Sequence, residues 1–423
     1  MNIRVKGGQV LSGEITPSGS KNSIVALIPA TILFDKKITL QNVPEISDVE
    51  RLIKIMTKLG SVIKWNKKTF EMEIDNSKLR FKDLDQEDLG NMKGTSLLWG
   101  PMLARFKKVE FKDLPGGCTL GMRPLDAHYE AFKSLGVIVN ENPNSASMDA
   151  GKAKATIFWL REMSVTATEN VIMLATSLKG VTKIIGAASE PQVQDLCNFL
   201  VKAGVKIYGI GSSVLEITGT EKLKAINHKI LSDHYEIATF LALAAATGGE
   251  IKIKNAMPEL FNQIGYVFNR FGIKLEYKGE TVILRKGQKI NFDNLSIKAQ
   301  PWPGLPVDLL PIFIPLALAG PKSQVLFHNW MYESGLFWTS ELSKLGANII
   351  MADPHRVIVT GGNKLMGAKL EAPYIIRAVV AMVMAAMISE GESTILNADA
   401  LYRGHPHFAE NLRKLGAEIE EIK

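Results

Sequence analysis

The chain has 423 residues, of which 46% are hydrophobic and 22% charged, a composition typical of a globular protein with more than one core. Its 50 basic residues exceed its 43 acidic residues and give a formal net charge of +7, which suits small anionic substrates. The basic residues form no long run and no recognised motif, so nucleic acid is not an expected partner. Two distant cysteines, Cys118 and Cys197, indicate neither a disulfide framework nor a metal site.

The N-terminal segment, residues 1–15, lacks the apolar run of a signal peptide. Apolar segments further along the chain are too short and too interrupted to span a membrane. We therefore expect a cytoplasmic protein without membrane insertion.

One pattern recurs six times along the chain: a helix-like segment ends in glycine, and a short alternation of apolar and polar residues follows. The glycines lie 68 to 76 residues apart and are Gly60, Gly136, Gly204, Gly272, Gly346 and Gly416. Glycine is the favoured residue just after a helix, and the alternation indicates a half-buried strand. The spacing is long enough for one supersecondary unit per repeat.

Each repeat also contains a strongly apolar segment, followed by a strand. The apolar segments are residues 22–34, 95–106, 169–178, 236–247, 308–319 and 375–388. Helices that are apolar on nearly every face belong in a core. The pattern therefore predicts an inside-out α/β barrel fold, in which sheets surround buried helices.

Six units of buried helix, strand, outer helix and strand divide naturally into two domains of three units each. We expect the strand material before Ser18 to pair with the last unit. The C-terminal domain would then be discontinuous, comprising residues 1–20 and 231–423, and residues 21–230 would form the other domain.

Polar residues mark the expected start of each buried helix. In chain order they are Ser18, Lys21 and Asn22; Lys93; Ser164 and Thr166; Asp233, His234 and Glu236; Asp308; and Arg377. Helix N-termini attract anions, although capping alone would explain the serines and aspartates. It does not explain Lys21, Lys93 and Arg377, because a cation there opposes the helix dipole. These three cations indicate an anion-binding pocket.

Asp308 follows three prolines that stiffen the approach to its helix. It could cap the helix, accept a proton from a substrate hydroxyl, or do both. None of the seven histidines forms a metal-binding or catalytic pattern. His405 and His407 are expected at the surface or as capping residues.

The glycine-rich loop at residues 114–128 presents Cys118 ahead of Arg123. Glycines free the loop backbone to turn its N–H groups toward a ligand. A neighbouring cation favours the thiolate, so Cys118 could act as a nucleophile or a general acid. The alternative is a small apolar residue within a core.

Two motifs, PGGCTLGMRP at residues 115–124 and SGSKN at residues 18–22, resemble the UDP-N-acetylglucosamine 1-carboxyvinyltransferase family of enolpyruvyl transferases, and the similarity extends over the whole chain. The resemblance implies transfer of the enolpyruvyl group of phosphoenolpyruvate to the 3-hydroxyl of UDP-N-acetylglucosamine, with release of phosphate. This is the first committed step of peptidoglycan synthesis. No cofactor is implied, since phosphoenolpyruvate is a co-substrate, and the two domains are expected to close over the sugar nucleotide.

The resemblance also implies roles for individual residues. Cys118 would be the acid and covalent acceptor of phosphoenolpyruvate, and Asp308 would be the base. Lys21 would be the third catalytic residue and would hold phosphoenolpyruvate together with Arg123 and Arg403, with Arg377 nearby. Asn22 and Asp308 would contact the sugar, Lys93 would also bind substrate, and Asp48 would be a further acid of the site. The residues implied to contact the uridine nucleotide are Arg123, Pro124, Leu125, Asp126, Ser164, Val165 and Thr166.

The chain departs from the family pattern at three positions. Lys93 and Gly335 stand where the family has arginines, and Ile375 stands where it has an acid. Loss of a charge-assisted contact can cost ~2–5 kcal/mol. Two alternatives therefore stay open: an impaired homologue that binds the nucleotide sugar, and a transferase with another acceptor, as in the related shikimate enzyme.

Overall fold

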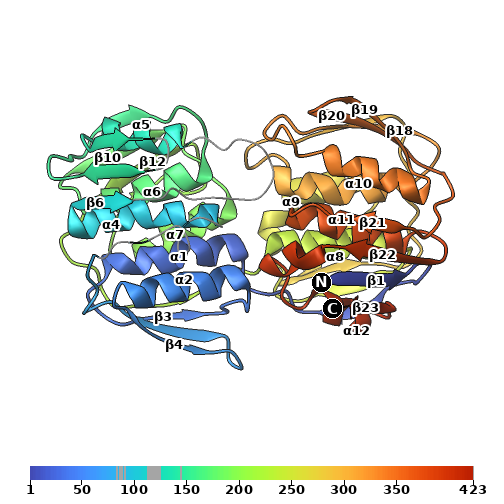
Figure 1. Cartoon of the computed structure of the whole chain (residues 1–423), viewed down its shortest axis with the longest axis horizontal. Coiled ribbons are helices and arrows are strands. Elements are labelled where there is room, and N and C mark those ends of the chain that lie inside the picture. Colours follow the sequence, from blue (N-terminus) through green and yellow to red (C-terminus); the bar gives the residue numbers. More distant parts are fainter. Residues whose placement is uncertain (82–83, 85–88, 90–91, 112–124, 143–144, 423) are drawn as a thin grey trace. The chain divides into compact units, whose positions relative to one another are not determined.

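The structure is a computed structural model that describes residues 1–422 except 82–83, 85–88, 90–91, 112–124 and 143–144. The described residues form two compact units. One comprises residues 19–231, and the other comprises residues 1–18 together with residues 232–422 (Figure 1). Each unit has its own hydrophobic core.

Buried helices form the centre of each core, as the apolar segments predicted. In the unit of residues 19–231 they are α1 (Lys21–Ala30), α4 (Trp99–Phe106), which follows the 3-10 helix η2 (Lys93–Leu98), and α6 (Val165–Ala175). In the other unit they are α8 (His234–Ala246), α10 (Leu310–Leu318) and α11 (Ile376–Met387). Helix α10 contacts both α8 and α11, and all of its residues are buried.

Outer helices precede the six repeat glycines. They are α2 (Ser47–Lys58), α5 (Asp126–Ser134), α7 (Pro191–Lys202), α9 (Phe261–Arg270), the 3-10 helix η5 (Phe337–Leu345) and α12 (Phe408–Lys414). All six glycines have positive φ, between 76° and 105°. The strands that follow are β4 (Val62–Asn66), β7 (Ile138–Glu141), β11 (Lys206–Tyr208), β15 (Leu275–Lys278), β19 (Asn348–Asp353) and β23 (Ile419–Ile422). The predicted succession of helix, glycine and strand is confirmed.

Each sheet contains the strand that follows a buried helix. These strands are β3 (Ile38–Gln41), β6 (Lys108–Phe111), β10 (Val181–Ile185), β14 (Glu250–Ile253), β18 (Gln324–His328) and β22 (Glu392–Leu396). Among the described strands, all lie inside their sheets except β6, which lies at an edge. In every sheet, a further strand lies between the strand that follows the buried helix and the strand that follows the outer helix, and it pairs antiparallel with both. In the same order, these middle strands are β5 (Glu71–Asp75), β8 (Ala146–Asp149), β12 (Val214–Thr218), β16 (Thr281–Leu284), β20 (Arg356–Thr360) and β1 (Asn2–Lys6).

Among the described residues, five of the six sheets also carry a short parallel strand at one edge. These edge strands are β13 (Asn227–Lys229), β9 (Ile157–Trp159), β2 (Ser12–Ile15), β17 (Leu295–Lys298) and β21 (Lys369–Glu371). The predicted unit of two helices and two strands was therefore too small, since most units use four strands. Four further 3-10 helices are η1 (Thr31–Leu33), η3 (Pro258–Leu260), η4 (Val307–Leu309) and η6 (Ala398–Arg403).

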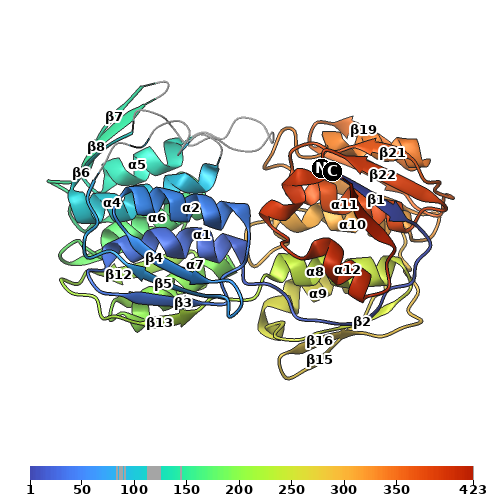
Figure 2. The same cartoon turned by 60° about the horizontal axis from the view of Figure 1, so that its bottom comes forward.

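The N-terminal segment supplies strands to two different sheets. β1 lies between β22 and β23 of the last repeat, where Ile3 pairs with both Ile395 and Glu421. The expectation that this segment pairs with the last unit is confirmed for β1. It is wrong for β2, which runs parallel to β14 of the fourth repeat. Figure 2 shows β2 near β15 and β16, which belong to the same sheet.

Candidate active site

Lys21 begins helix α1 and pairs with an acid from the next outer helix. The Ser20 hydroxyl caps α1 by accepting the N–H of Ser23 at 3.3 Å, which places Lys21 in the first turn. The Lys21 ammonium lies 3.0 Å from a carboxylate oxygen of Asp48, and only 15% and 8% of these side chains are exposed. Asp48 thus offsets the unfavourable position of the cation at a helix N-terminus. Asn22 follows in the same turn and is half-buried.

Two predicted nucleotide-binding segments lie next to each other. Leu125 and Asp126 begin α5, and Ser164 caps α6 by accepting the N–H of Ala167 at 3.3 Å.

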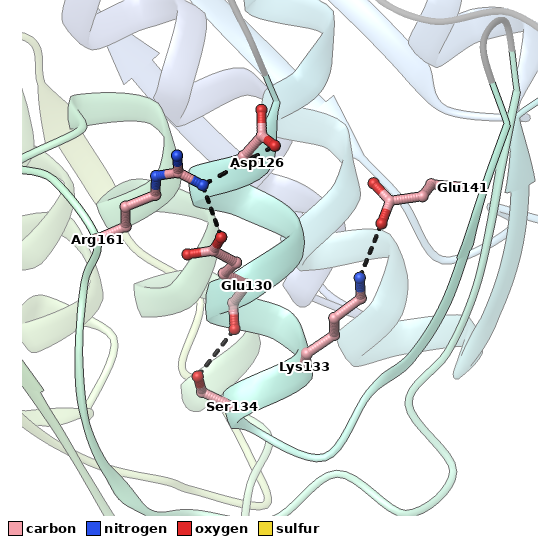
Figure 3. Close-up of polar contacts among 6 residues, drawn as sticks. All are labelled: Asp126, Glu130, Lys133, Ser134, Glu141 and Arg161. Carbon is pink, nitrogen blue, oxygen red and sulfur yellow. Dashed lines mark hydrogen bonds and ion pairs between the residues drawn. The ribbon is translucent and has the colours of Figure 1, made fainter.

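Arg161, just before that cap, joins the segments through α5. Its guanidinium lies 2.8 Å from a carboxylate oxygen of Glu130 and 4.0 Å from one of Asp126 (Figure 3). On the other side of α5 in Figure 3, the Lys133 ammonium lies 2.8 Å from a carboxylate oxygen of Glu141 in β7. Val165 and Thr166, half-buried in the first turn of α6, complete the second segment.

Several predicted residues lie outside the described part of the chain. They are Cys118, Arg123 and Pro124, together with the side chain of Lys93. The roles assigned to them remain predictions from the sequence.

In the other unit, Arg377 has three neighbours that fix its guanidinium. Nη1 donates to Nε2 of His405 at 2.7 Å, and Nε lies 3.9 Å from Oδ2 of Asp308. The face of the guanidinium lies over Tyr235, with Cζ 4.7 Å from the ring centroid. The Arg377 side chain is 8% exposed, whereas that of Asp308 is 38% exposed. Asp308 therefore combines access to solvent with a cation at ion-pair distance.

Arg403 ends η6 and is paired with the segment before α11. Its Cζ lies 5.2 Å from the ring centroid of Tyr374, which is within cation–π range. Arg403 and His405 stand on either side of Gly404. Two contacts, from Tyr374 to Arg403 and from Arg377 to His405, thus connect the start of α11 with the turn after η6.

The first turn of α8 adds two fully buried ionisable side chains. Burial lowers the pKa of His234, Asp233 and Asp308 partly oppose the shift, and the charge of Arg377 adds to it, so that the pKa falls to about 4. Burial and then the charge of Asp233 raise the pKa of Glu236 to about 7, although it accepts the backbone N–H of Ser18 at 2.8 Å. Both shifts favour the neutral side chains beside the guanidinium of Arg377.

The capping alternatives are confirmed for two residues and wrong for two others. Ser164 caps α6, and Asp233 caps α8. Ser18 lies before the cap of α1 and bonds instead to Glu236, and Asp308 lies inside η4, where Pro306 is the N-cap residue.

The expectation for His405 is also wrong. His405 is 0% exposed, because its ring lies against Phe408, 5.7 Å between centroids, and its Nε2 accepts from Arg377. The sequence signal for the burial of His405 is indirect. Position 375 holds isoleucine where the family has an acid, so the buried guanidinium of Arg377 needs another hydrogen-bond acceptor. His407 is half-exposed and pairs with Glu410 at 3.3 Å; it makes no side-chain capping bond.

The structure gives a physical account of the two uncharged departures from the family pattern. A Cβ atom at Gly335 would overlap the side-chain amide of Asn329, which is 3% exposed. Oδ1 of Asn329 accepts the N–H groups of Met331 and Tyr332, at 3.2 Å each, so the amide cannot rotate away without losing both bonds. Ile375 is buried and occupies the N-cap position of α11 without a capping bond. The local structure is thus adapted to glycine at 335.

Among the described residues, no helix is both long and apolar enough to cross a membrane. Within the same residues, no three acidic, histidine or cysteine side chains are grouped as a metal site would require.

Residues 5–421 match the family model of EPSP synthase (3-phosphoshikimate 1-carboxyvinyltransferase). The chain belongs to the EPSP synthase family. Within that family, it is 38% identical over 425 residues to a UDP-N-acetylglucosamine 1-carboxyvinyltransferase of Borreliella burgdorferi, which covers 99% of this chain and 98% of the relative. A protein of the same name from Bacteroides thetaiotaomicron is also 38% identical, over 432 residues and 99% of both chains.

Solved structures of the family share the fold. The enolpyruvyl transferase NikO from Streptomyces tendae matches with a TM-score of 0.88 at 19% identity, over 99% of this chain and 98% of that one. EPSP synthase from Acinetobacter baumannii matches with a TM-score of 0.73 at 16% identity, over 99% of this chain and all of that one. The inside-out α/β fold predicted from the repeats is confirmed.

Proposed function

We propose that this protein transfers the enolpyruvyl group of phosphoenolpyruvate to the 3-hydroxyl of UDP-N-acetylglucosamine and releases phosphate. The observation that carries the proposal is the 38% identity, over nearly the full length, to enzymes named for this reaction. The reaction forms a bond between the sugar oxygen and C2 of phosphoenolpyruvate while C3 takes up a proton. Loss of phosphate and of a C3 proton then restores the double bond.

The proposed roles follow the chemistry of the described groups. Asp308, 38% exposed and 3.9 Å from Arg377, is suited to accept the proton of the attacking hydroxyl. Lys21, Arg377 and Arg403 supply positive charge for the carboxylate and phosphate of phosphoenolpyruvate. Cys118 is proposed as the acid that protonates C3, and Arg123 as a further phosphate ligand, both from the family motif. In the cell, this activity places the protein in the cytoplasm at the start of peptidoglycan synthesis.

The test is phosphate release from phosphoenolpyruvate with and without UDP-N-acetylglucosamine, with the product identified by mass spectrometry. We expect release that depends on the sugar nucleotide and a product heavier by one carboxyvinyl group. Asp308→Asn should lower kcat by about 10²- to 10⁴-fold, as for loss of a general base. Asp293→Asn, an exposed aspartate of the same unit, is the matched control and should leave kcat unchanged.

A binding protein without turnover is the second candidate, and Gly335 and Ile375 favour it. The uncharged residues at these positions leave fewer groups to stabilise the transferring anion. Binding of UDP-N-acetylglucosamine without any phosphate release would establish that alternative. Release with shikimate 3-phosphate, but not with the sugar nucleotide, would identify another acceptor.

A further inference from the structure

His405 is a buried residue without an assigned role, and it contacts a candidate substrate-binding cation. Arginine has only donor nitrogens, so at 2.7 Å from Nη1 the His405 Nε2 must be the acceptor. Acceptance requires a lone pair on Nε2, which exists only in the neutral ring with its proton on Nδ1. A hydrogen bond at this contact therefore requires a neutral His405 that is protonated on Nδ1.

A neutral acceptor has a different consequence from a carboxylate. An acid beside Arg377 would orient the guanidinium and also neutralise it, whereas an imidazole orients it and leaves the charge unpaired. Position 375, at the N-cap of α11, holds isoleucine instead of an acid, and the carboxylate of Asp308 lies at ion-pair distance, 3.9 Å, from Nε of Arg377. His405 orients the guanidinium without adding a second negative charge to that pair.

The same contact helps to place Arg403. The backbone N–H groups of Gly404 and His405 both donate to Leu401 O, at 3.1 and 3.0 Å, so the turn that follows Arg403 is compact. Anchoring His405 to α11 through Arg377 therefore restrains the backbone of Arg403 as well. The cation–π contact between Tyr374 and Arg403 restrains the same pair of segments a second time.

We propose that His405, as a neutral acceptor, is the positioning residue that aims Arg377 and the turn bearing Arg403 at phosphoenolpyruvate. The inference rests on the proposed function, because it assigns these two cations to that substrate. Protonation of His405 would remove the acceptor and set two cations against each other. A charged ring at position 405 would therefore weaken phosphoenolpyruvate binding.

Other ionisable groups surround this contact and set the controls. From α8 they are Asp233, His234, Tyr235 and Glu236; from η4, Asp308; and from η6, Arg403. Charged groups on the other elements near this region pair among themselves: Lys344 with Glu341 on η5, Lys6 of β1 with Glu418, and Glu410 of α12 with His407 and Lys414. Glu236, whose pKa is raised to about 7, titrates within the pH range of the experiment and needs its own control variant.

The deciding measurement is kcat/KM for phosphoenolpyruvate from pH 5 to 8.5 in the wild type and three variants. His405→Gln keeps a neutral acceptor that does not titrate. His405→Phe keeps an aromatic ring beside Phe408 and removes the acceptor. Glu236→Gln removes the competing titration. The substrate phosphate also titrates, near pH 6, but it does so equally for every variant.

We expect His405→Gln, which keeps a neutral acceptor, to have kcat/KM close to the wild-type value at pH 8. His405→Phe should raise KM and lower kcat/KM by about 10- to 100-fold at pH 8, as for loss of a hydrogen bond to a charged group. Any pH dependence that Glu236→Gln removes belongs to Glu236. A His405→Phe variant of wild-type KM, or a His405→Gln variant as impaired as His405→Phe, would overturn the proposal.

A second readout does not depend on activity. In protein labelled with ¹⁵N-histidine, the imidazole signals that disappear in His405→Gln report the tautomer of His405. We expect a neutral ring protonated on Nδ1 at pH 8, and a change of both nitrogen shifts in Arg377→Gln. A ring protonated on Nε2 would refute the contact. If the wild type releases no phosphate but shows the expected tautomer, the proposed function fails while the contact stands, so the two failures are distinguishable.

Discussion

The first turn of α8 places two ionisable side chains in one buried environment and shifts their pKa values in opposite directions. For His234 burial lowers the pKa to about 4, and for Glu236 it raises the pKa to about 7. The ordinary values are 6.5 and 4.5. Both side chains therefore enter the folded state in neutral form over much of the mildly acidic range, next to the charged Arg377.

These shifts have opposite effects on stability. Between pH 4.5 and 7, folded Glu236 holds a proton that unfolded Glu236 has released, so its contribution to stability falls as the pH rises. Between pH 4 and 6.5, folded His234 lacks a proton that unfolded His234 binds, so its contribution rises with pH. The two slopes oppose each other up to about pH 6.5, and only that of Glu236 continues above it.

Glu236→Gln should therefore gain stability over the wild type as the pH is raised from 5 to 7.5. Glutamine still accepts the N–H of Ser18 but carries no charge to bury. The expected difference is on the order of 2–3 kcal/mol between the two ends of this range. It is measured by urea unfolding at several pH values, with exposed Glu259→Gln as the matched control. A difference from wild type that does not change with pH would contradict the buried titration of Glu236.

At the level of elements, the repeat glycines tie the sequence pattern to the fold. Gly346 ends η5 with φ 88° and ψ 14°, a left-handed conformation. An added Cβ would have ordinary van der Waals contact, 3.4 Å from the carbonyl oxygen of Lys364. The cost of a side chain here is therefore conformational and not steric.

We expect Gly346→Ala to lower the free energy of unfolding by about 1–2 kcal/mol, the cost of the left-handed region for an ordinary residue. Gly346→Asn should lose clearly less, because asparagine tolerates this conformation. The midpoint of urea unfolding measures both. Equal losses for the two variants would mean that contacts, and not φ, determine the choice of glycine.

Elements with a local signal could be predicted from the sequence, and elements defined by distant pairing could not. Glycine after a helix and alternation in a strand are local features, and so are Lys21 and Arg377 at the starts of apolar helices. β2 and β13, by contrast, are short strands stabilised by partners far away in the chain, such as β14 and β3. His405 follows the same rule: its burial depends on Arg377, 28 residues earlier, and on the absence of an acid at Ile375.

At the scale of the whole molecule, the chain leaves one compact unit at residue 18 and returns to it at residue 232. Both termini belong to that unit and lie side by side (Figure 1). Asn2 pairs with Ile422 in adjacent antiparallel strands, and the N-terminal ammonium lies 2.9 Å from Asp399. A short linker could therefore join the two ends without distorting the sheet.

This connectivity predicts that a permuted chain, residues 232–423 followed by a linker of about four residues and then residues 1–18, folds without the remainder of the protein. The same fragment without residues 1–18 should not fold cooperatively. It lacks β1, the strand between β22 and β23, and with it Ile3 and Val5, both 0% exposed. Burial of each such side chain contributes about 1.5–3 kcal/mol, and the vacated position would expose unpaired backbone groups on both neighbouring strands.

Urea unfolding followed by circular dichroism, with amide exchange of β22 and β23, distinguishes the permuted chain from the shortened one. We expect a single sigmoidal transition and slow exchange in these strands for the permuted chain only. Residues 19–231, expressed alone, control for the stability of the other unit. If residues 232–423 unfold as cooperatively as the permuted chain, β1 is dispensable, and the pairing of the N-terminal strand with the last repeat does not hold this unit together.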